Sequence, residues 1–421
     1  MFINFQEVEL FFSDRKSFGI KPGLDRMKTL LQLLGSPEKK INGIHVAGTN
    51  GKGSTIQYMK NALMQNGYKV GVFISPSPNE MTGHIFMNDN PIKKEAFTRL
   101  LNDMYPFINI LDAQNQHPTE FEIITVLAFL YFAGSTDIAL IETGMGGRED
   151  TTNCFLPLLS IITNVSRDHM TFLGNTVEEI AFHKAGIIKH HVPAIIGPMQ
   201  GAALKVIEQA AAAVQTKLFR YNQTFFITEG SGDQAFMWQG YLNNRLTVSI
   251  RMMGKHQQVN ASLAVMALIK LAEQGFTIHM KKALEGIQQT VFHGRFEPVS
   301  KSPRIILDGA HNEAGIRSLI EAAALIKSSQ EKHVLFAAFK DKDIQTMLTL
   351  LQNYFDTVTL TTFDHPRAAT VEELVTYAQS DQIIVARNWQ DAIKTMDTGN
   401  LHFITGSLHF IAKVRNFILN R

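Results

Sequence analysis

Short apolar runs alternate with longer segments of helical spacing along almost the whole chain, and this pattern gives the first indication of its fold. In the first part, four such runs are rich in β-branched or large apolar residues, and each ends in polar or glycine-rich sequence. We predict strands at residues 43–47, 69–74, 137–142 and 159–165. Thr176 and Glu179 have the spacing of a capping box at the start of a helix over residues 176–187. Strands that alternate with helices predict a mostly parallel sheet with helices on its faces.

The same alternation restarts near residue 304, after a stretch whose composition is typical of a linker. Residues 292–303 contain Gly294, Pro298, two serines and Pro303. We place a domain boundary near Pro298, between residues 1–297 and residues 298–421. Further strands are predicted at residues 304–307, 333–339, 357–361, 382–386 and 402–405. The sequence thus predicts an α/β protein, with a P-loop-type, mostly parallel sheet in the N-terminal domain and a doubly wound α/β C-terminal domain.

The composition and charge of the chain indicate which kinds of partner and cellular compartment to expect. The 421 residues include 40 Lys and Arg against 38 Asp and Glu, and the net charge of +2 predicts no broad basic surface for nucleic acid. A single cysteine, Cys154, excludes an internal disulfide and suits a reducing compartment. The chain begins without the pattern of an export signal, and its most apolar stretch, residues 123–133, is about half of the roughly 20 residues that cross a bilayer. We therefore expect a cytoplasmic protein without a membrane span, in which that stretch is a buried helix.

The strongest local signal is HVAGTNGKGS at residues 45–54, where an apolar strand runs into three glycines, a lysine and a serine before a helix. Glycines let backbone N–H groups approach phosphate oxygens, the helix N-terminus favours negative charge, and Lys52 can neutralise β- and γ-phosphate charge. The spacing from Gly48 to Gly51 is shorter than in the GxxxxGK[ST] pattern. The alternative is a glycine-rich turn with a surface lysine, which the strand and helix on either side disfavour. The pattern favours nucleotide binding.

Three other predicted strands of this domain are followed by groups that suit a magnesium ion, namely Ser75, Glu142 and His169. The carboxyl ends of parallel strands share one edge of the sheet, and ligands bind beyond that edge. Mg²⁺ needs few protein ligands when it bridges phosphate oxygens, since it keeps waters and substrate oxygens in its shell. Taken singly, each residue has a more ordinary interpretation, as a strand-end cap, a solvated charge or a loop histidine. Their common edge favours a metal site.

Other polar positions leave alternatives open. The glycine-rich run at residues 142–153 could order a substrate, although alone it is a weak signal. From its spacing, Lys184 is a surface lysine near a helix end. Asp308 follows a predicted strand and either accepts ribose hydroxyls or caps the next helix. Arg295 either reaches phosphates from between the domains or forms an interdomain salt bridge.

Several ordered blocks of sequence resemble the folylpolyglutamate synthase/dihydrofolate synthase family of the Mur ligase superfamily. They are HVAGTNGKGS, ETGMGGREDTTN, SRDHMTFLG, KAGII, HGRFE, DGAHN and FKDKD. The resemblance spans nearly the whole chain. It implies an ATP-dependent ligase that uses Mg²⁺ and adds L-glutamate to folate or dihydropteroate through an acyl phosphate. We also expect a monomer.

The resemblance assigns roles position by position. It implies catalytic roles for Lys52, His169 and Lys184, with a carbamate on Lys184. The implied ATP contacts are Asn50, Gly51, Lys52, Gly53, Ser54, Asn260, Arg295 and Asp308. The implied metal ligands are Ser75, Glu142 and His169. The implied pterin-site residues are Gly23, Leu24, Asp25, Arg26, Phe121, Glu122, Glu149, Asp150 and Thr151.

Two departures from the family pattern touch the active site. The loop after Ser75 carries Thr82, Gly83 and His84 where the family usually has an acidic residue and an arginine. His183 stands where a glutamate usually precedes the carbamate lysine. The departures leave two alternatives to a folate ligase: a Mur-type ligase with another acceptor, which the folate-like HGRFE and KGS blocks disfavour, or a protein that binds ATP and folate but has lost turnover.

Overall fold

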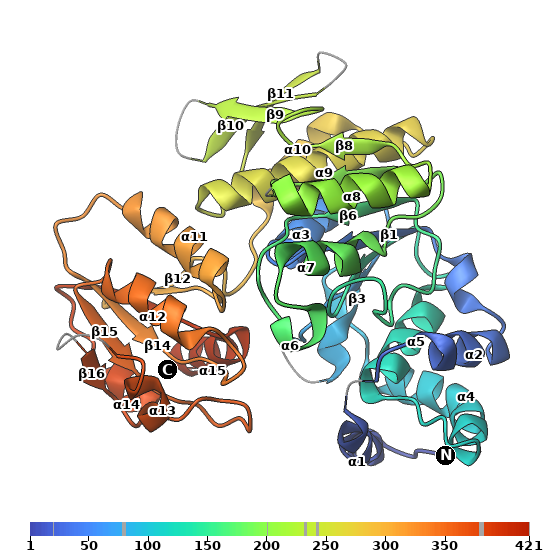
Figure 1. The fold of residues 1–421 in the computed structure, drawn as a ribbon, viewed down its shortest axis with the longest axis horizontal. Helices are drawn as coiled ribbons and strands as arrows, with labels where there is room; N and C mark the ends of the chain where they lie inside the picture. Colours follow the sequence, from blue (N-terminus) through green and yellow to red (C-terminus); the bar gives the residue numbers. More distant parts are fainter. Residues whose placement is uncertain are drawn as a thin grey trace.

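An eight-stranded, mostly parallel sheet forms the centre of the N-terminal part of the chain (Figure 1). The computed structural model describes residues 1–19, 21–77, 81–199, 201–230, 234–240, 244–378 and 383–420. The strand order is β4-β3-β2-β5-β1-β6-β7-β8, and only β3 and β4 run antiparallel to their neighbours. The strands are β1 (Gly43–Ala47), β2 (Val70–Phe73), β3 (Ile85–Met87), β4 (Asn90–Pro91), β5 (Ile138–Glu142), β6 (Leu159–Ile162), β7 (Ala194–Ile196) and β8 (Leu218–Arg220).

Helices cover both faces of this sheet, because the central strands are apolar at nearly every position. β1 and β5 are buried along their whole lengths. Leu140 of β5 packs with α3 (Lys52–Gln65) and α9 (Lys255–Glu273), whereas Ile141 packs with α4 (Lys94–Ala113) and α5 (Glu120–Phe132) on the other face. The remaining helices here are α1 (Phe5–Arg15), α2 (Asp25–Leu33), α6 (Met170–Leu173), α7 (Val177–Ala185), α8 (Gly201–Ala213) and α10 (Met280–Gln289).

A small antiparallel sheet, which the sequence analysis missed, stands on the outer side of α9 (Figure 1). It contains β9 (Phe226–Glu229), β10 (Ala235–Gln239) and β11 (Arg245–Ser249). Phe236, Trp238 and Val248 belong to the same core as α9. This sheet therefore extends the N-terminal core away from the strand ends that carry the predicted site residues.

The C-terminal domain is a six-stranded sheet with helices on both faces. Its strand order is β12-β13-β17-β14-β15-β16, and only β12 is antiparallel. Ile306 packs with α11, α12 and α13, whereas Leu307 packs with α14 and α15, which makes the domain doubly wound. The strands are β12 (Glu297–Lys301), β13 (Arg304–Leu307), β14 (Lys332–Phe336), β15 (Thr357–Leu360), β16 (Ile383–Val385) and β17 (Leu401–Thr405). The helices are α11 (Glu313–Ala324), α12 (Ile344–Gln352), α13 (Val371–Val375), α14 (Trp389–Lys394) and α15 (Leu408–Leu419).

The predicted α/β architecture is confirmed, with one correction. The capping box of Thr176 and Glu179 is present at the start of α7, and residues 123–132 lie in the buried helix α5. Among the described residues, no helix combines the length and the apolar character that a membrane span requires. The linker interpretation is wrong for residues 297–301, which form β12 of the C-terminal sheet. Gln382, the first residue of one predicted strand, lies outside the described residues. The division at residues 297 and 298 stays a prediction.

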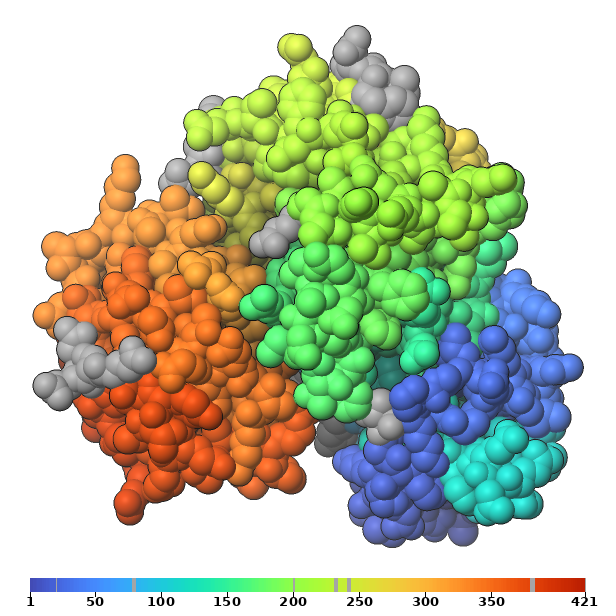
Figure 2. Space-filling model, in the orientation of Figure 1, coloured from blue at the N-terminus to red at the C-terminus, as the bar shows by residue number. Residues whose placement is uncertain are grey.

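The two domains meet beside the carboxyl ends of both parallel sheets. α11 of the C-terminal domain packs against α9 of the N-terminal domain. Figure 2 shows the orange and red C-terminal surface in contact with the green surface of the N-terminal domain, while a hollow separates it from the blue N-terminal helices. The predicted phosphate loop lies at the domain junction, where both domains can contribute side chains to one site.

Candidate functional site

The phosphate loop lies between the end of β1 at Ala47 and the start of α3 at Lys52. At two positions of the loop, neighbouring side chains lie so close that only glycine fits. Gly51 has φ +86°, and a Cβ there would lie 2.4 Å from Asn260 Oδ1. At Gly48 a Cβ would lie 1.8 Å from Thr163 Oγ1. Gly51 caps α3 without a side chain, so the first N–H groups of this helix stay available to an anion.

Lys52 is folded back over the loop. Its ammonium donates to the carbonyl oxygens of Gly48 at 3.1 Å and Thr49 at 3.4 Å, and Nζ lies 3.8 Å from Glu142 Oε1. The side chain is 16% exposed, so it is held close to the protein yet reaches the cavity above the loop. This places a positive charge at the position where the sequence predicted phosphate binding.

A cavity of about 320 Å³ lies above the loop and is lined by both domains. It brings together every residue that the sequence analysis assigned to ATP, to metal or to catalysis. From the N-terminal domain come Asn50, Gly51, Lys52, Gly53, Ser54, Ser75, Glu142, His169, Lys184, Asn260 and Arg295. Asp308, Gly309, Ala310 and His311 come from the C-terminal domain. These residues are separated by up to 261 positions in the sequence, from Asn50 to His311, so their convergence supports the predicted site.

The donor set of Ser75, Glu142 and His169 fits a divalent cation. Burial raises the pKa of Glu142 to about 7, although Lys52 and Arg295 favour its ionised form. Burial also lowers the pKa of His169 to about 4, which leaves a neutral imidazole. In the part of the chain that the structure describes, no three His, Cys, Asp or Glu side chains gather into a metal cluster. Phosphate oxygens and water would therefore complete the shell, as Mg²⁺ prefers.

Lys184 is buried rather than exposed, against the interpretation of its spacing as a surface lysine. Its exposure is 3%, and it lines the cavity from the last turn of α7. Burial, together with the nearby charge of Lys52, lowers the pKa of its amine to about 7. Within the described residues the amine has no hydrogen-bond or ion-pair partner. A buried and partly neutral amine has the chemistry that carbamate formation needs.

Asp308 and Arg295 lie together at the domain junction. Asp308 accepts hydrogen bonds from the backbone N–H groups of Phe296 and Ala310, both at 2.9 Å. It does not cap the following helix, because Asn312 is the N-cap of α11. Arg295 forms no salt bridge within 4 Å among the described residues, which argues against the interface ion pair. Its charge instead acts on Glu142 and Asp308, beside the cavity.

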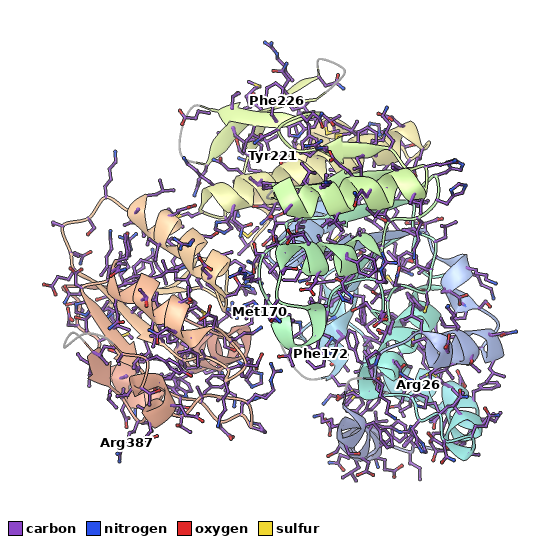
Figure 3. The ribbon with its side chains drawn as sticks, viewed as in Figure 1. Arg26, Met170, Phe172, Tyr221, Phe226 and Arg387 are labelled. Carbon is purple, nitrogen blue, oxygen red and sulfur yellow. The ribbon has the colours of Figure 1, made fainter. Side chains whose placement is uncertain are left out.

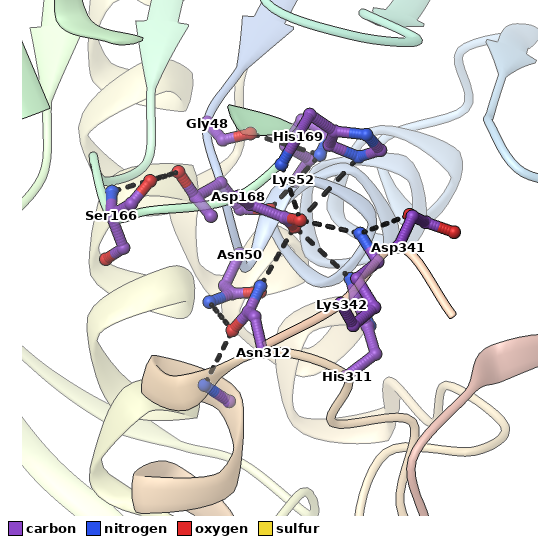
Figure 4. A network of polar contacts seen from close by, with 12 residues as sticks. Gly48, Asn50, Lys52, Ser166, Asp168, His169, His311, Asn312, Asp341 and Lys342 are labelled. Carbon is purple, nitrogen blue, oxygen red and sulfur yellow. Dashed lines mark hydrogen bonds and ion pairs between the residues drawn. The ribbon is translucent and has the colours of Figure 1, made fainter. Parts of the chain in front are cut away.

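Sequence reasoning missed three residues that join the domains at this cavity. Asp168 of the N-terminal domain contacts Lys342 and Asn312 of the C-terminal domain (Figure 4). All three lie in the recognised blocks SRDHMTFLG, FKDKD and DGAHN, and Asp168 precedes a predicted metal ligand. The family blocks therefore marked these segments as important. No local sequence pattern, however, could reveal that residues 168 and 342 form a pair.

Comparisons with known proteins agree with this geometry. The Mur ligase middle domain family matches residues 46–268, and the Mur ligase glutamate ligase domain family matches residues 294–408. The dihydrofolate synthase/folylpolyglutamate synthase of Bacillus subtilis is 38% identical to this chain, over 96% of this chain and 98% of the relative. The chain belongs to the folylpolyglutamate synthase family of Mur ligases.

Solved structures of the family have the same fold. The Mycobacterium tuberculosis folylpolyglutamate synthase complexed with ADP and AMPPCP has a TM-score of 0.90 at 28% identity, and the match covers 98% of each chain. A bifunctional folylpolyglutamate synthase/dihydrofolate synthase with Mn, AMPPNP and L-glutamate bound has a TM-score of 0.85 at 25% identity, over 98% of this chain and 97% of the other. The predicted family and fold class are therefore confirmed.

The nine predicted pterin-site residues of this Mur ligase lie outside the lining of the cavity. Several have structural partners of their own. Arg26 donates from Nε to Glu122 Oε1 at 3.1 Å, and Glu122 completes the capping box of α5 with Thr119. Gly23, Leu24 and Asp25 lead into α2, and Glu149 is exposed. In Figure 3 Arg26 lies on the far side of Phe172 from the C-terminal domain.

The other three pterin-site residues are closer to the cavity. The ring of Phe121 lies 2.6 Å from the position of a Cβ on Gly144, which lines the cavity. Thr151 Oγ1 lies 2.7 Å from the hydroxyl of Thr125. Asp150 accepts hydrogen bonds from its own loop, including the backbone N–H of Met145 at 2.7 Å. A role of these nine residues in pterin binding stays a prediction.

Both departures from the family pattern lie outside the residues that line the cavity. His84 donates from Nδ1 to the Ile74 carbonyl at 2.8 Å and lies 6.1 Å from the Phe121 ring. Burial lowers its pKa, so the imidazole is neutral and no fixed cation stands there. His183 lies against Gly146, with its Cβ 3.4 Å from the position of a Cβ on that glycine. Thr82 and Gly83 precede His84 in a short 3₁₀ helix over Met81–His84.

Proposed function

We propose that this protein is an ATP-dependent ligase that forms an amide between L-glutamate and the carboxylate of a folate-type acid. The observation that carries the proposal is the single cavity at the domain junction, which gathers the phosphate loop, the candidate metal ligands and Lys184. Its relatives are named folylpolyglutamate synthases and dihydrofolate synthases, and solved relatives hold ADP, nucleotide analogues, Mn and L-glutamate. ATP and a divalent cation are therefore its proposed nucleotide and metal.

The reaction has two steps. An oxygen of the acceptor carboxylate attacks the γ-phosphorus of ATP, the bond from that phosphorus to the leaving oxygen of ADP breaks, and an acyl phosphate forms. The amino group of glutamate then attacks the acyl carbon, phosphate leaves, and the nitrogen loses a proton. Phosphoryl transfer depends mainly on positioning and electrostatic stabilisation by the protein.

The charged groups of this chain fit those demands. Lys52 lies at the loop that would hold the phosphates, and Arg295 reaches the same cavity from the domain junction. Mg²⁺, held by Ser75, Glu142 and His169, would supply positive charge that neutralises the phosphate oxygens. The C-terminal domain covers the cavity and would exclude water, which hydrolyses an acyl phosphate.

Lys184 is proposed to carry a carbamate. The amine is buried and partly neutral, and it has no partner within the described parts of the chain; carbon dioxide reacts only with the neutral amine. The carbamate is an anion on the wall of the cavity that also holds Lys52, whose charge would stabilise it. This modification provides a negative group where the chain itself has only a lysine.

The acceptor is proposed to be a folate, dihydropteroate or both. Of the nine predicted pterin-site residues, Phe121 lies next to the cavity through its contact with Gly144, so an acceptor bound there could extend its carboxylate toward Lys52. His84 lies near Phe121 and His183 lies against Gly146, so the two departures from the family pattern would act on the choice of acceptor. A cytoplasmic location and a monomeric state stay predictions.

Release of ADP in the presence of each acceptor tests the proposal. We expect steady-state ADP release only when a pterin acid and L-glutamate are both present, because the acyl phosphate has no productive outlet without the amine. Lys52→Ala should abolish it, whereas Lys394→Met, which removes an exposed ion pair with Asp391, should not. ADP release at the same rate with and without glutamate would overturn the proposal that the protein is a ligase. Nucleotide and folate binding without ADP release would support a binding protein that has lost turnover, and turnover with a different acid would support another acceptor.

A further inference from the structure

A buried ion pair joins the two domains beside the phosphate loop (Figure 4). Lys342 Nζ of the C-terminal domain donates to Asp168 Oδ1 of the N-terminal domain at 2.6 Å. Both side chains are 6% exposed. Asn312 Nδ2 donates to the other carboxylate oxygen of Asp168 at 3.0 Å, and His311 Nε2 lies 3.6 Å from the same oxygen. Each oxygen of this carboxylate therefore meets a group from the second domain.

The ion pair lies among polar groups of the C-terminal domain, since Asn312 and His311 also face the Asp168 carboxylate. Because both partners are buried, solvent screens their attraction far less than that of a surface pair. Removal of one partner would leave a buried charge with weaker compensation, since Asp341 lies 3.9 Å from Lys342 and His311 lies 3.6 Å from Asp168. This loss is still more costly than loss of an exposed pair.

The same cluster reaches the phosphate loop. Asn50 of the loop and Asn312 exchange two hydrogen bonds, at 3.0 and 3.1 Å. Asn312 also caps α11 by accepting from the Gly315 N–H at 2.9 Å. On the N-terminal side, Asp168 Oδ1 accepts from the backbone N–H of His169 at 2.8 Å. The cluster thus ties the first turn of α11 to the loop and to the segment that carries a candidate metal ligand.

We propose that Asp168, Lys342 and Asn312 form an interdomain latch that holds the C-terminal domain closed over the phosphate loop. These are positioning residues, since the reaction would be carried out by other groups. Asp308 is four residues before Asn312 in the same strand-to-helix connection, so movement of this connection would shift Asp308 against Lys52 and Glu142. The latch would hold the cavity geometry through side-chain contacts between the two domains.

The latch predicts a specific defect in turnover, and this part rests on the proposed ligase function. An open C-terminal domain would admit water to the acyl phosphate, so ATP would be consumed without amide formation. It would also weaken any site for glutamate that both domains complete. Loss of the latch should therefore lower the yield of amide per ADP and raise the KM for glutamate. The rate of the first phosphoryl transfer should change less.

Small-angle X-ray scattering of the ligand-free protein tests the latch itself. The wild-type curve should match the closed structure, with a radius of gyration near the value of about 22 Å expected for a compact chain of this length. Lys342→Met and Asp168→Asn should both increase the radius of gyration, and the double variant should add little to either single one, since all remove the same contact. Lys394→Met is the matched control, because it removes an exposed lysine–aspartate pair of the same domain. Circular dichroism confirms that each variant is folded.

A second experiment measures the amounts of ADP and of amide product formed in the same reaction. For Lys342→Met we expect the KM for glutamate to rise by up to about thirtyfold, the lower end of the cost of truncating a buried charge pair. We also expect more ADP than amide to be formed. A Lys342→Met protein with unchanged scattering, glutamate KM and product ratio would overturn the latch, as would two single variants whose effects simply add. If the protein proved inactive on every acceptor, the scattering result would still decide whether the latch exists, so the two proposals fail separately.

Discussion

Lys184→Ala should remove nearly all ligase turnover, and the reason is the protonation state of the buried amine. Burial lowers the pKa of Lys184 from 10.5 to about 7. At about pH 7.5 an amine with this pKa is roughly three-quarters neutral, whereas one with a pKa of 10.5 is neutral in about one molecule in a thousand. Burial thus raises the fraction that can react with carbon dioxide by several hundred-fold.

The same pKa shift predicts how the unmodified lysine affects stability. Because the folded pKa is lowered, the unfolded chain binds the proton more tightly between about pH 7 and pH 10.5. The free energy of unfolding should therefore rise with pH through this window in protein freed of carbon dioxide. Lys184→Met keeps the volume and removes the amine, so its stability should lack this rise and equal or exceed the wild type at pH 7. The measurement is the melting temperature as a function of pH.

Rescue separates a carbamate from a simple structural role. Formate or acetate should occupy the space vacated in Lys184→Ala and restore part of the ADP release, whereas chloride at equal ionic strength should not. A ¹³C signal from labelled bicarbonate should appear on the wild-type protein and be absent from this variant. An active Lys184→Ala protein, or a wild-type protein with an unmodified amine and full activity, would refute the reasoning.

Three further predictions concern single contacts. Lys52→Ala should abolish turnover with little change in melting temperature, because its 16% exposed side chain reaches the phosphates and adds little core area; activity within a few-fold of the wild type would place Lys52 away from them. Arg295→Ala should lower kcat more than stability, and the reverse result would favour a structural arginine. The double change Gly83→Glu and His84→Arg restores the family pair and should alter the KM for the acceptor; unchanged kinetic constants would make this departure neutral.

Much of the site could be predicted because parallel strands impose a simple geometry. β1, β2, β5 and β6 were recognised as apolar runs, and they were expected to present their polar ends at one edge of a sheet. The expectation that Ser75, Glu142 and His169 share this edge needs no knowledge of the helices. The burial of Lys184 could not be predicted in this way, because α7 is short and its last turn is covered by residues from distant parts of the chain.

The linker error has a physical reason. Proline and serine are typical of linkers, but an edge strand also tolerates them, because one row of its backbone groups needs no partner. β12 is the edge of the C-terminal sheet, and its register shifts between Pro298 and Ser300. β9, β10 and β11 were missed for a related reason: they form a small antiparallel sheet that follows none of the strand–helix alternation used for the rest.

A polar group whose hydrogen-bonding capacity is already filled mainly stabilises the fold, whereas a group without partners is available for chemistry. Asp150 accepts several hydrogen bonds from its own loop, and Glu122 is bound to Arg26 and Thr119, so their replacement should disturb folding first. Among the residues that the structure describes, Lys184 has no hydrogen-bond or ion-pair partner, although burial of a free amine is costly. Buried groups without partners concentrate at functional sites, so we predict that Lys184 takes part in the chemistry, whereas Asp150 and Glu122 stabilise the fold.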